Sequence, residues 1–211
     1  MTASLLTYWF GPPAAGEGAS HSSAARVHTD AIIVRAIQQG DREAFDRLFR
    51  AYYGRLWVYA RRRCASDDVA NDVVQDVFIA LWTSRATWSI RVSIKAYLFG
   101  AVQRRILHLR RHAAVVARVE AESVAAGTLL GLGAAPLAAD AQTDVAERAR
   151  LISHAVQTLP ERQRTVLALW WRDEMTSPEI AEVLGVSPQA VRKLLAKAWS
   201  HLRDELSSEL R

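Results

Sequence analysis

Apolar residues recur along the N-terminal half of the chain at the spacing of amphipathic helices. A helical pattern begins near Asp30, and Asp41 is a suitable N-cap for a helix with apolar positions at Phe45, Leu48, Phe49, Tyr52, Leu56 and Val58. Ser66 is the corresponding cap for a helix whose apolar face contains Val69, Val73, Val74, Val77, Phe78 and Leu81. A further helix is expected from about Ser93 to Arg111, with an apolar stripe of Ile94, Leu98, Val102, Ile106 and Leu109. No strand-like alternation competes, so the pattern predicts an all-α fold.

The helical pattern is interrupted twice. Residues 1–28 are rich in Ala, Gly, Ser and Pro and are expected to form a flexible extension, and residues 113–145 have the composition of a linker. Helical periodicity resumes after this linker. We therefore predict two small helical domains, residues 29–112 and 146–211, joined by a flexible segment.

The sharpest local signal is a helix-turn-helix between Ser177 and Ala198. Ser177-Pro178 and Ser187-Pro188 each supply a capping residue followed by proline at the start of a helix, where its missing N–H costs nothing. Gly185 lies between them, where the turn needs a permissive backbone. The expected inward positions are Ile180, Leu184, Val186, Val191 and Leu194. The alternative is a helical hairpin that does not bind DNA.

The second helix of this motif carries the candidate DNA-reading side chains. Burial of the apolar stripe of this helix leaves a polar side that can enter the major groove. The candidate residues on this side and at the helix cap are Ser187, Gln189, Arg192, Lys193 and Lys197. Arg192 is suited to guanine and Gln189 to adenine, whereas Lys193 and Lys197 can equally contact phosphates. Glu179 and Glu182 on the first helix oppose DNA affinity and are expected to face solvent or a protein partner.

Charge placement changes the picture of the N-terminal domain. The 211-residue chain has a formal net charge of +5, yet from Val77 to Val119 there is no Asp or Glu. The basic side chains there are interleaved with Trp88, Tyr97 and Phe99, as on surfaces that bind phosphates and bases. A solvated basic helix face without a partner is the alternative.

Composition excludes several other classes. The single cysteine, Cys64, rules out an internal disulfide and suits a reducing compartment. It follows three arginines, which favours a lowered thiol pKa. No apolar run is long enough to span a membrane and the first residues lack a basic signal-peptide region, so we expect a cytoplasmic protein. His108 and His112 lack a third ligand at metal spacing, and no phosphate loop or nucleophile elbow is present, so no metal, cofactor or enzymatic activity is expected.

Taken together, these segments resemble a known family. The run Ala70-Asn71-Asp72-Val73-Val74-Gln75-Asp76-Val77-Phe78, a basic aromatic helix, a linker, and then LPERQRTVLAL and EIAEVLGVSPQAVRKLLAKAW are similar to bacterial RNA polymerase sigma factors of the extracytoplasmic-function (ECF) type. The resemblance covers about residues 30–206. Without the linked first half, the helix-turn-helix would fit other regulators equally well.

The resemblance implies a role for each domain. In this family the helix carrying Asp72, Gln75 and Asp76 docks on the clamp helices of the polymerase beta-prime subunit. The first domain also recognises and opens the promoter minus-ten element, holding an extruded base near the loop that corresponds to residues 86–93. The residues implied for minus-ten binding and melting are Trp88, Arg91, Lys95, Arg104, Arg105 and Arg111. Trp88 is either such a residue or part of the core.

The second domain of the family reads the minus-thirty-five element and contacts the polymerase beta flap. The resemblance thus implies core RNA polymerase and promoter DNA as partners and a monomeric protein. An anti-sigma factor is the family's usual regulator, although nothing in the sequence identifies one. Arg104 stands where the family commonly has Asn, His108 where Asp is common, and Ala190 where Thr is frequent. The minus-ten preference therefore does not follow from the sequence.

Two further classes of function compete with a sigma factor. A free-standing operator-binding regulator would dimerise on palindromic half-sites about one helical turn apart. A metal- or thiol-dependent enzyme would need a constellation around His108, His112 or Cys64.

Overall fold

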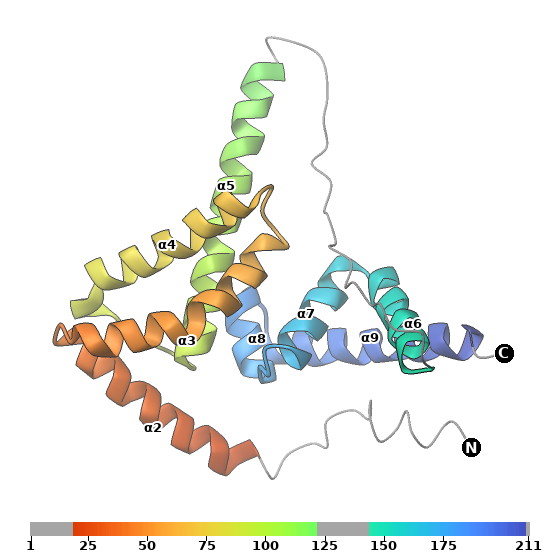
Figure 1. Cartoon of the computed structure of the whole chain (residues 1–211), viewed down its shortest axis with the longest axis horizontal. Helices are drawn as coiled ribbons and strands as arrows, with labels where there is room; N and C mark the ends of the chain where they lie inside the picture. The colour runs from red at the N-terminus through yellow and green to blue at the C-terminus, as the bar shows by residue number, and fades with distance from the viewer. Residues whose placement is uncertain (1–18, 122–143, 210–211) are drawn as a thin grey trace. The chain divides into compact units, whose positions relative to one another are not determined.

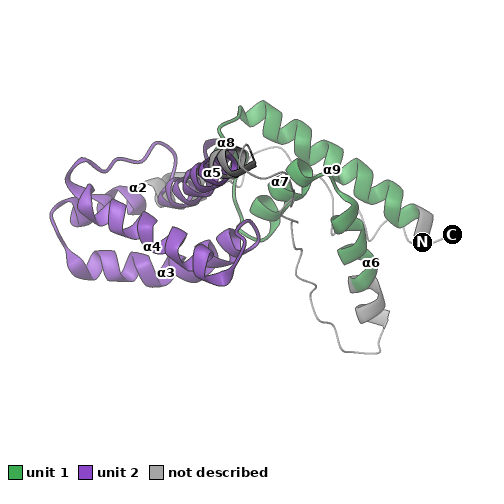
Figure 2. Ribbon diagram, turned by 90° about the horizontal axis from the view of Figure 1, so that it is seen from above, with its two compact units in different colours: residues 1–23, 136–181, 185–211 green, residues 24–135, 182–184 purple. Residues whose placement is uncertain are grey.

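The computed structural model describes residues 19–121 and 144–209, and within these ranges the chain forms eight α-helices, one short 3-10 helix and no strand (Figure 1). The chain divides into two compact units (Figure 2), each described here by itself. One contains most of α2 (Ala19–Gln38) together with α3 (Arg42–Arg61), α4 (Asp67–Thr83), η1 (Arg85–Thr87) and α5 (Ile94–Ala121). The other contains α6 (Asp144–Thr158), α7 (Glu161–Trp171), most of α8 (Ser177–Leu184) and α9 (Pro188–Glu209). The prediction of an all-α protein with two helical domains is confirmed.

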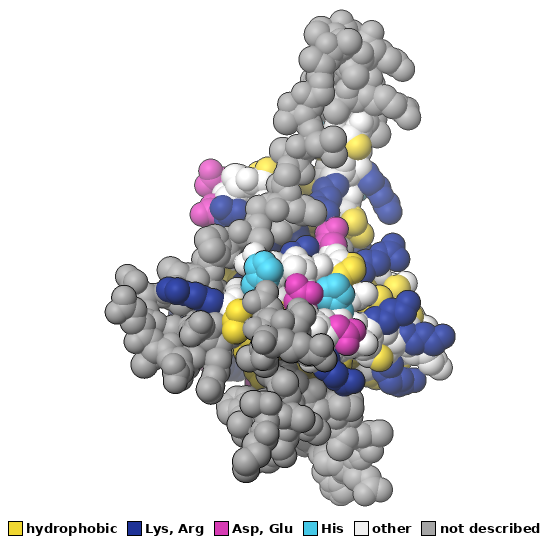
Figure 3. Space-filling model, turned by 90° about the vertical axis from the view of Figure 1, so that its right-hand side faces the viewer, with side chains coloured by type: hydrophobic (Ala, Val, Ile, Leu, Met, Phe, Trp, Pro, Cys, Tyr) yellow, Lys and Arg dark blue, Asp and Glu magenta, His cyan; other side chains and the backbone are white. Residues whose placement is uncertain are grey.

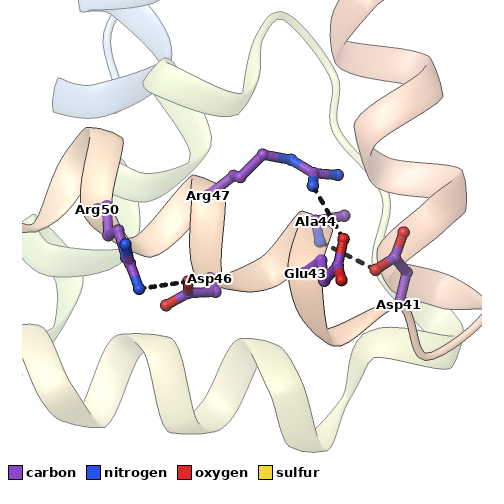
Figure 4. A network of polar contacts seen from close by, with 6 residues as sticks. All are labelled: Asp41, Glu43, Ala44, Asp46, Arg47 and Arg50. Atoms are coloured by element: carbon purple, nitrogen blue, oxygen red, sulfur yellow. Dashed lines mark hydrogen bonds and ion pairs between the residues drawn. The ribbon is translucent and has the colours of Figure 1, made fainter.

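Helix α3 begins as its sequence predicts. The Asp41 carboxylate accepts a hydrogen bond of 3.0 Å from the backbone N–H of Ala44, which satisfies one of the unpaired N–H groups at the helix start (Figure 4). Gly40, at φ +87°, supplies the left-handed backbone that ends α2 just before this cap. Exposed ion pairs follow along the helix, Arg47 with Glu43 at 3.6 Å and Arg50 with Asp46 at 2.9 Å. Each such pair adds only about 0.3–0.5 kcal/mol.

The core of the first unit forms where α4 and α5 pack against α3. Phe45 lies 4.9 Å from Trp82 between ring centroids, and Phe49 lies 4.8 Å from Phe78. Ser66 caps α4 by accepting a hydrogen bond from the N–H of Val69, as predicted. These contacts fix α4 on α3 by its apolar face.

Tyr59 joins α3 to α5. Its ring is 1% exposed and lies 5.2 Å from that of Phe99, and its hydroxyl donates to Gln103 at 2.7 Å. Because the phenol finds an acceptor, the ring is buried without leaving its polar atom unpaired.

Several predicted boundaries differ from the structure. Helix α5 continues to Ala121 rather than ending near Arg111, and α2 begins at Ala19 rather than near Asp30. The expected flexible extension and linker therefore each include helical residues, 19–28 and 113–121, while residues 1–18 and 122–143 lie outside the described part of the chain. Val58 and Val69, expected on apolar faces, are each 37% exposed.

In the second unit, α6 and α7 pack against α9. The residues that fill this core are Ala155, Leu159, Val166, Leu169, Ala198, Trp199 and Leu202. Trp170 meets Trp199 edge to face at 5.6 Å. Helix α9 is thereby packed by one side, and its other side is left exposed.

Candidate nucleic-acid interface

The turn between α8 and α9 has the geometry that a helix-turn-helix requires. Gly185 ends α8 in the left-handed conformation, at φ +66°, which a residue with a side chain adopts only with strain. Ser187 then begins α9 by accepting a hydrogen bond of 3.2 Å from the N–H of Ala190, with Pro188 as the first helical residue. Both features were predicted from the sequence.

The start of α8 differs from the prediction in one residue. The N-cap is Thr176 rather than Ser177, and Glu179 completes a capping box with it. The Glu179 carboxylate accepts hydrogen bonds from the Thr176 N–H at 2.8 Å and from its hydroxyl at 3.0 Å. Glu179 is therefore 6% exposed, which contradicts the expectation that it faces solvent or a partner. It stabilises the motif instead of repelling DNA from the surface.

The apolar positions of the motif are partly as expected. Ile180 and Val191 are fully buried, whereas Leu184 and Leu194 are half-buried and Val186 is 41% exposed. Leu195, not Leu194, is the buried leucine that follows Val191 in α9. The helix is thus rotated slightly from the register that the sequence pattern predicted.

One continuous side of α9 remains exposed. The predicted DNA-reading residues all lie in it or at its cap, and all are exposed: Ser187, Gln189, Arg192, Lys193 and Lys197. The structure therefore brings these side chains together at the N-terminal half of one helix, the part that enters the major groove in helix-turn-helix proteins.

In the first unit, α5 and the loop before it carry the other basic group. Arg91, Arg104, Arg105 and Arg111 are exposed, and Lys95 is half-buried. Figure 3 views the molecule from the side on which α6 and α9 lie in Figure 1, and on that face too Lys and Arg side chains gather along one edge. Cations at this density suit a phosphate backbone.

Trp88 does not belong to this surface. Its side chain is 3% exposed and lies 5.6 Å from the ring of Tyr97, so the structure assigns it to the core, the second of the two positions that the sequence left open. Its placement among residues that contact DNA is thereby corrected. The indole Nε1 has no hydrogen-bond acceptor among the described residues.

The loop around Trp88 is shaped by local hydrogen bonds. Arg85 donates to the carbonyl of Trp82 at 2.8 Å and lies over its ring at 4.6 Å, and the Trp88 N–H donates back to Arg85 at 3.1 Å. The chain then continues without regular structure until α5 begins.

The acidic face predicted on α4 is present. Asp72 and Gln75 are exposed, and Ile79 beside them is 63% exposed. Asp76, expected to be equally available, forms an ion pair with Arg105 of α5, with Oδ2 2.6 Å from Nη2 and 3.1 Å from Nε. Both side chains of this pair stay about half exposed, so it is accessible to a partner and worth about 0.2–1 kcal/mol.

Cys64 is the nucleophile that an enzymatic function would use. Burial raises the pKa of the Cys64 thiol, although Arg110, Arg63 and Arg61 act to lower it, so the expected lowered pKa is wrong. Within the described residues no group of three His, Cys, Asp or Glu side chains is placed to hold a metal ion. None of the described helices is long and apolar enough to cross a membrane.

Comparison with known families decides what this arrangement is. Residues 48–115 match the model for sigma-70 region 2, and residues 149–202 match that for sigma-70 region 4. The chain is an RNA polymerase sigma factor of the ECF type. As such it belongs to a family of transcription initiation factors rather than of enzymes.

Relatives of this sigma factor agree with that assignment. It is 26% identical over 190 residues to the ECF RNA polymerase sigma factor SigM of Mycobacterium tuberculosis, covering 90% of this chain and 88% of SigM. It is 45% identical over 67 residues to sigma factor SigF of the same species, where the match covers 32% of this chain and 26% of SigF. It thus spans about a quarter of SigF but most of SigM.

A solved structure shares the fold. The sigma factor RpoE of Bartonella quintana, crystallised with the anti-sigma factor NepR, superposes with a TM-score of 0.55 at 18% identity, covering 77% of this chain and 96% of that one. At this identity the likeness concerns the fold alone.

Sequence reasoning missed three contacts of this sigma factor. The capping box was visible in principle, because Thr176 and Glu179 have its spacing. The pair of Asp76 with Arg105 joins residues far apart in the chain. So do the hydrogen bonds that Gln38 and Asp30 of α2 make to the backbone of Trp88 and Ile94. No local pattern indicates them.

Proposed function

We propose that this sigma factor binds core RNA polymerase and directs it to promoters by reading the minus-ten element with its region 2 and the minus-thirty-five element with its region 4. The observation that carries the proposal is the presence, on one chain, of both sigma regions with their polar faces exposed. We propose further that it acts as a monomer in the cytoplasm, where the polymerase is found.

For the minus-thirty-five element, α9 enters the major groove. Arg192 donates to guanine and Gln189 pairs with adenine, each contact contributing about 1–3 kcal/mol of discrimination. Lys193 and Lys197 contact phosphates, and Ser187 holds the helix start at the groove. Exposure of these residues on a single side supports this assignment.

For the minus-ten element, the basic residues of α5 and its preceding loop act together. Lys95, Arg104, Arg105 and Arg111 neutralise phosphates, which aids binding but carries no sequence information. Arg91, exposed in the loop, helps to hold the extruded base of the non-template strand. Trp88 supports the loop from within the core and does not stack on the base.

Docking on the polymerase uses α4. Asp72, Gln75 and Asp76 meet the basic clamp helices of the beta-prime subunit, and region 4 contacts the beta flap. Exposed carboxylates favour a basic partner and speed its association. Since the solved sigma factor RpoE of B. quintana is in complex with the anti-sigma factor NepR, we propose that this sigma factor too is bound by an anti-sigma protein.

Multi-round transcription tests the proposal. Core polymerase from the source organism is supplied with fragments of its own genomic DNA, with and without the protein. New discrete transcripts that depend on the protein, and whose start sites share two upstream elements, are expected. No new transcripts, together with no co-elution with core, would contradict the proposal and favour the operator-binding regulator, for which a dimer on a palindrome is the signature.

A further inference from the structure

Two side chains of α2 contact the ends of the loop formed by residues 89–93, which joins Trp88 to α5. At the first end, Gln38 Nε2 donates a hydrogen bond of 2.7 Å to the backbone carbonyl of Trp88. At the other end, Asp30 Oδ2 accepts one of 2.8 Å from the backbone N–H of Ile94, the first residue of α5. These contacts span 50 and 64 residues of sequence.

The Asp30 contact adds to a cap that α5 already has. Ser93 precedes the helix and accepts a hydrogen bond of 3.1 Å from the N–H of Ala96. Asp30 binds a different N–H, and its carboxylate lies at the positive end of the helix dipole. The start of α5 therefore depends on a hydrogen-bond acceptor from α2 as well as on its own capping residue.

The Gln38 contact holds the backbone of the buried Trp88, directly before the loop. The Trp88 ring is buried against Tyr97, so this residue is fixed through its side chain as well as through its carbonyl. Between the two fixed ends, Ser89 and Arg91 are exposed. Helix α2 thus fixes both ends of a short loop that has exposed residues between them.

We propose that Asp30 and Gln38 are positioning residues that hold the 89–93 loop in the shape that captures single-stranded minus-ten DNA. This inference rests on the proposed function of the loop. Extruding a base from the duplex costs a few kcal/mol that contacts in the pocket must offset. A loop fixed in advance does not lose its own conformational freedom on binding, so more of the contact energy is available for capture.

The test measures binding of the holoenzyme, assembled with core polymerase, to a fluorescent single-stranded oligonucleotide. The probe carries the non-template minus-ten strand of a promoter mapped by the transcription assay above. D30A removes the acceptor at Ile94, and Q38E keeps the size of the side chain but replaces its donor with a carboxylate. Each is expected to weaken binding of the probe about tenfold, whereas affinity for core and for minus-thirty-five duplex stays unchanged.

Two further variants separate positioning from stability. D30N keeps an oxygen that accepts the Ile94 hydrogen bond and is expected to restore most of the affinity. D41A is the matched control, since Asp41 is also a carboxylate that caps a helix start, but at α3 (Figure 4). It is expected to lower thermal stability as D30A does without weakening binding of the probe.

The outcomes distinguish this inference from the function on which it rests. If D30A and Q38E bind the probe as well as D41A does, Asp30 and Gln38 have only a structural role and the inference is wrong. If the wild-type holoenzyme does not bind the probe, or R91A binds it as well as wild type, the proposed function of the loop is wrong.

Discussion

Arg192 lies one helical turn into α9 and is exposed, next to the buried Val191. Its planar guanidinium has the donor geometry for the two major-groove acceptors of guanine. Arg192→Ala is expected to reduce transcription from cognate promoters and to relax discrimination at one base pair of the minus-thirty-five element, by about 1–3 kcal/mol. Transcription from a promoter library randomised at that element measures this, and an unchanged base preference would refute the role.

Lys197 supplies the contrast, because a contact with phosphate carries no sequence information. Lys197→Ala is expected to weaken binding by a similar factor on every sequence and to reduce its salt dependence, with the base preference intact.

Substitutions of Trp88 distinguish a role of its side chain in the core from a role in DNA binding. Replacement by Ala removes a buried indole and is expected to destabilise the protein by about 3–5 kcal/mol. Trp88→Phe keeps a ring and removes an N–H that has no acceptor in the described residues, so it is expected to cost much less and to retain transcription. Thermal unfolding and transcription of both variants check this. A stable Trp88→Phe protein that fails to open promoters would instead assign the indole to DNA.

The raised pKa of Cys64 predicts how the reactivity of its thiol depends on pH. Burial raises its pKa, and only the thiolate is nucleophilic, so reaction with a disulfide reagent is expected to be slower in the folded protein than in denaturant near neutral pH. The rate in the folded protein is expected to begin its rise at higher pH than for an unfolded thiol. Faster reaction in the folded state would show that the surrounding arginines outweigh burial.

At the scale of elements, α4 presents its carboxylates to the polymerase while one of them also pairs with α5. Asp72→Ala is expected to weaken affinity for core, and Asp76→Ala to do so as well while also releasing Arg105. Since the pair with Arg105 is half exposed, its loss costs little stability, and the effect on core affinity belongs to docking. Titration of core with labelled protein checks both variants, with affinity of the full chain for minus-thirty-five duplex as the control. Unaltered core affinity would refute the docking face.

Local signals made most elements predictable from the sequence. The caps at Asp41, Ser66 and Ser187 and the left-handed turn at Gly185 follow from one residue and its nearest neighbours, and all four are observed. Helix ends without such signals were misplaced. Helix α5 has no glycine or proline stop near Arg111 and continues to Ala121.

The site was predictable only where it lies on a single helix. The exposed side of α9 follows from helical spacing, and so does the acidic face of α4. The burial of Trp88 and the pairing of Asp76 with Arg105 depend on how the helices pack, so they could not be predicted from sequence spacing. The prediction for Glu179 was wrong because it considered the charge of the side chain and not its position three residues after Thr176, which is the spacing of a capping box.

In the whole molecule, the proposed function requires two DNA-reading units on one chain. Two tethered modules that bind neighbouring sites reach an affinity that neither reaches alone, provided that both engage together. Core polymerase, in this account, arranges the two units for that simultaneous contact. Loss of either element is therefore expected to weaken the complex far more than the loss of a single side-chain contact.

Footprinting on a promoter mapped by transcription distinguishes a sigma factor from a free-standing regulator. Core alone, the protein alone and the two combined are compared on the same duplex. Protection at both the minus-ten and the minus-thirty-five element is expected only for the combination. A symmetric footprint produced by the protein alone would contradict the account and identify a free-standing operator-binding regulator.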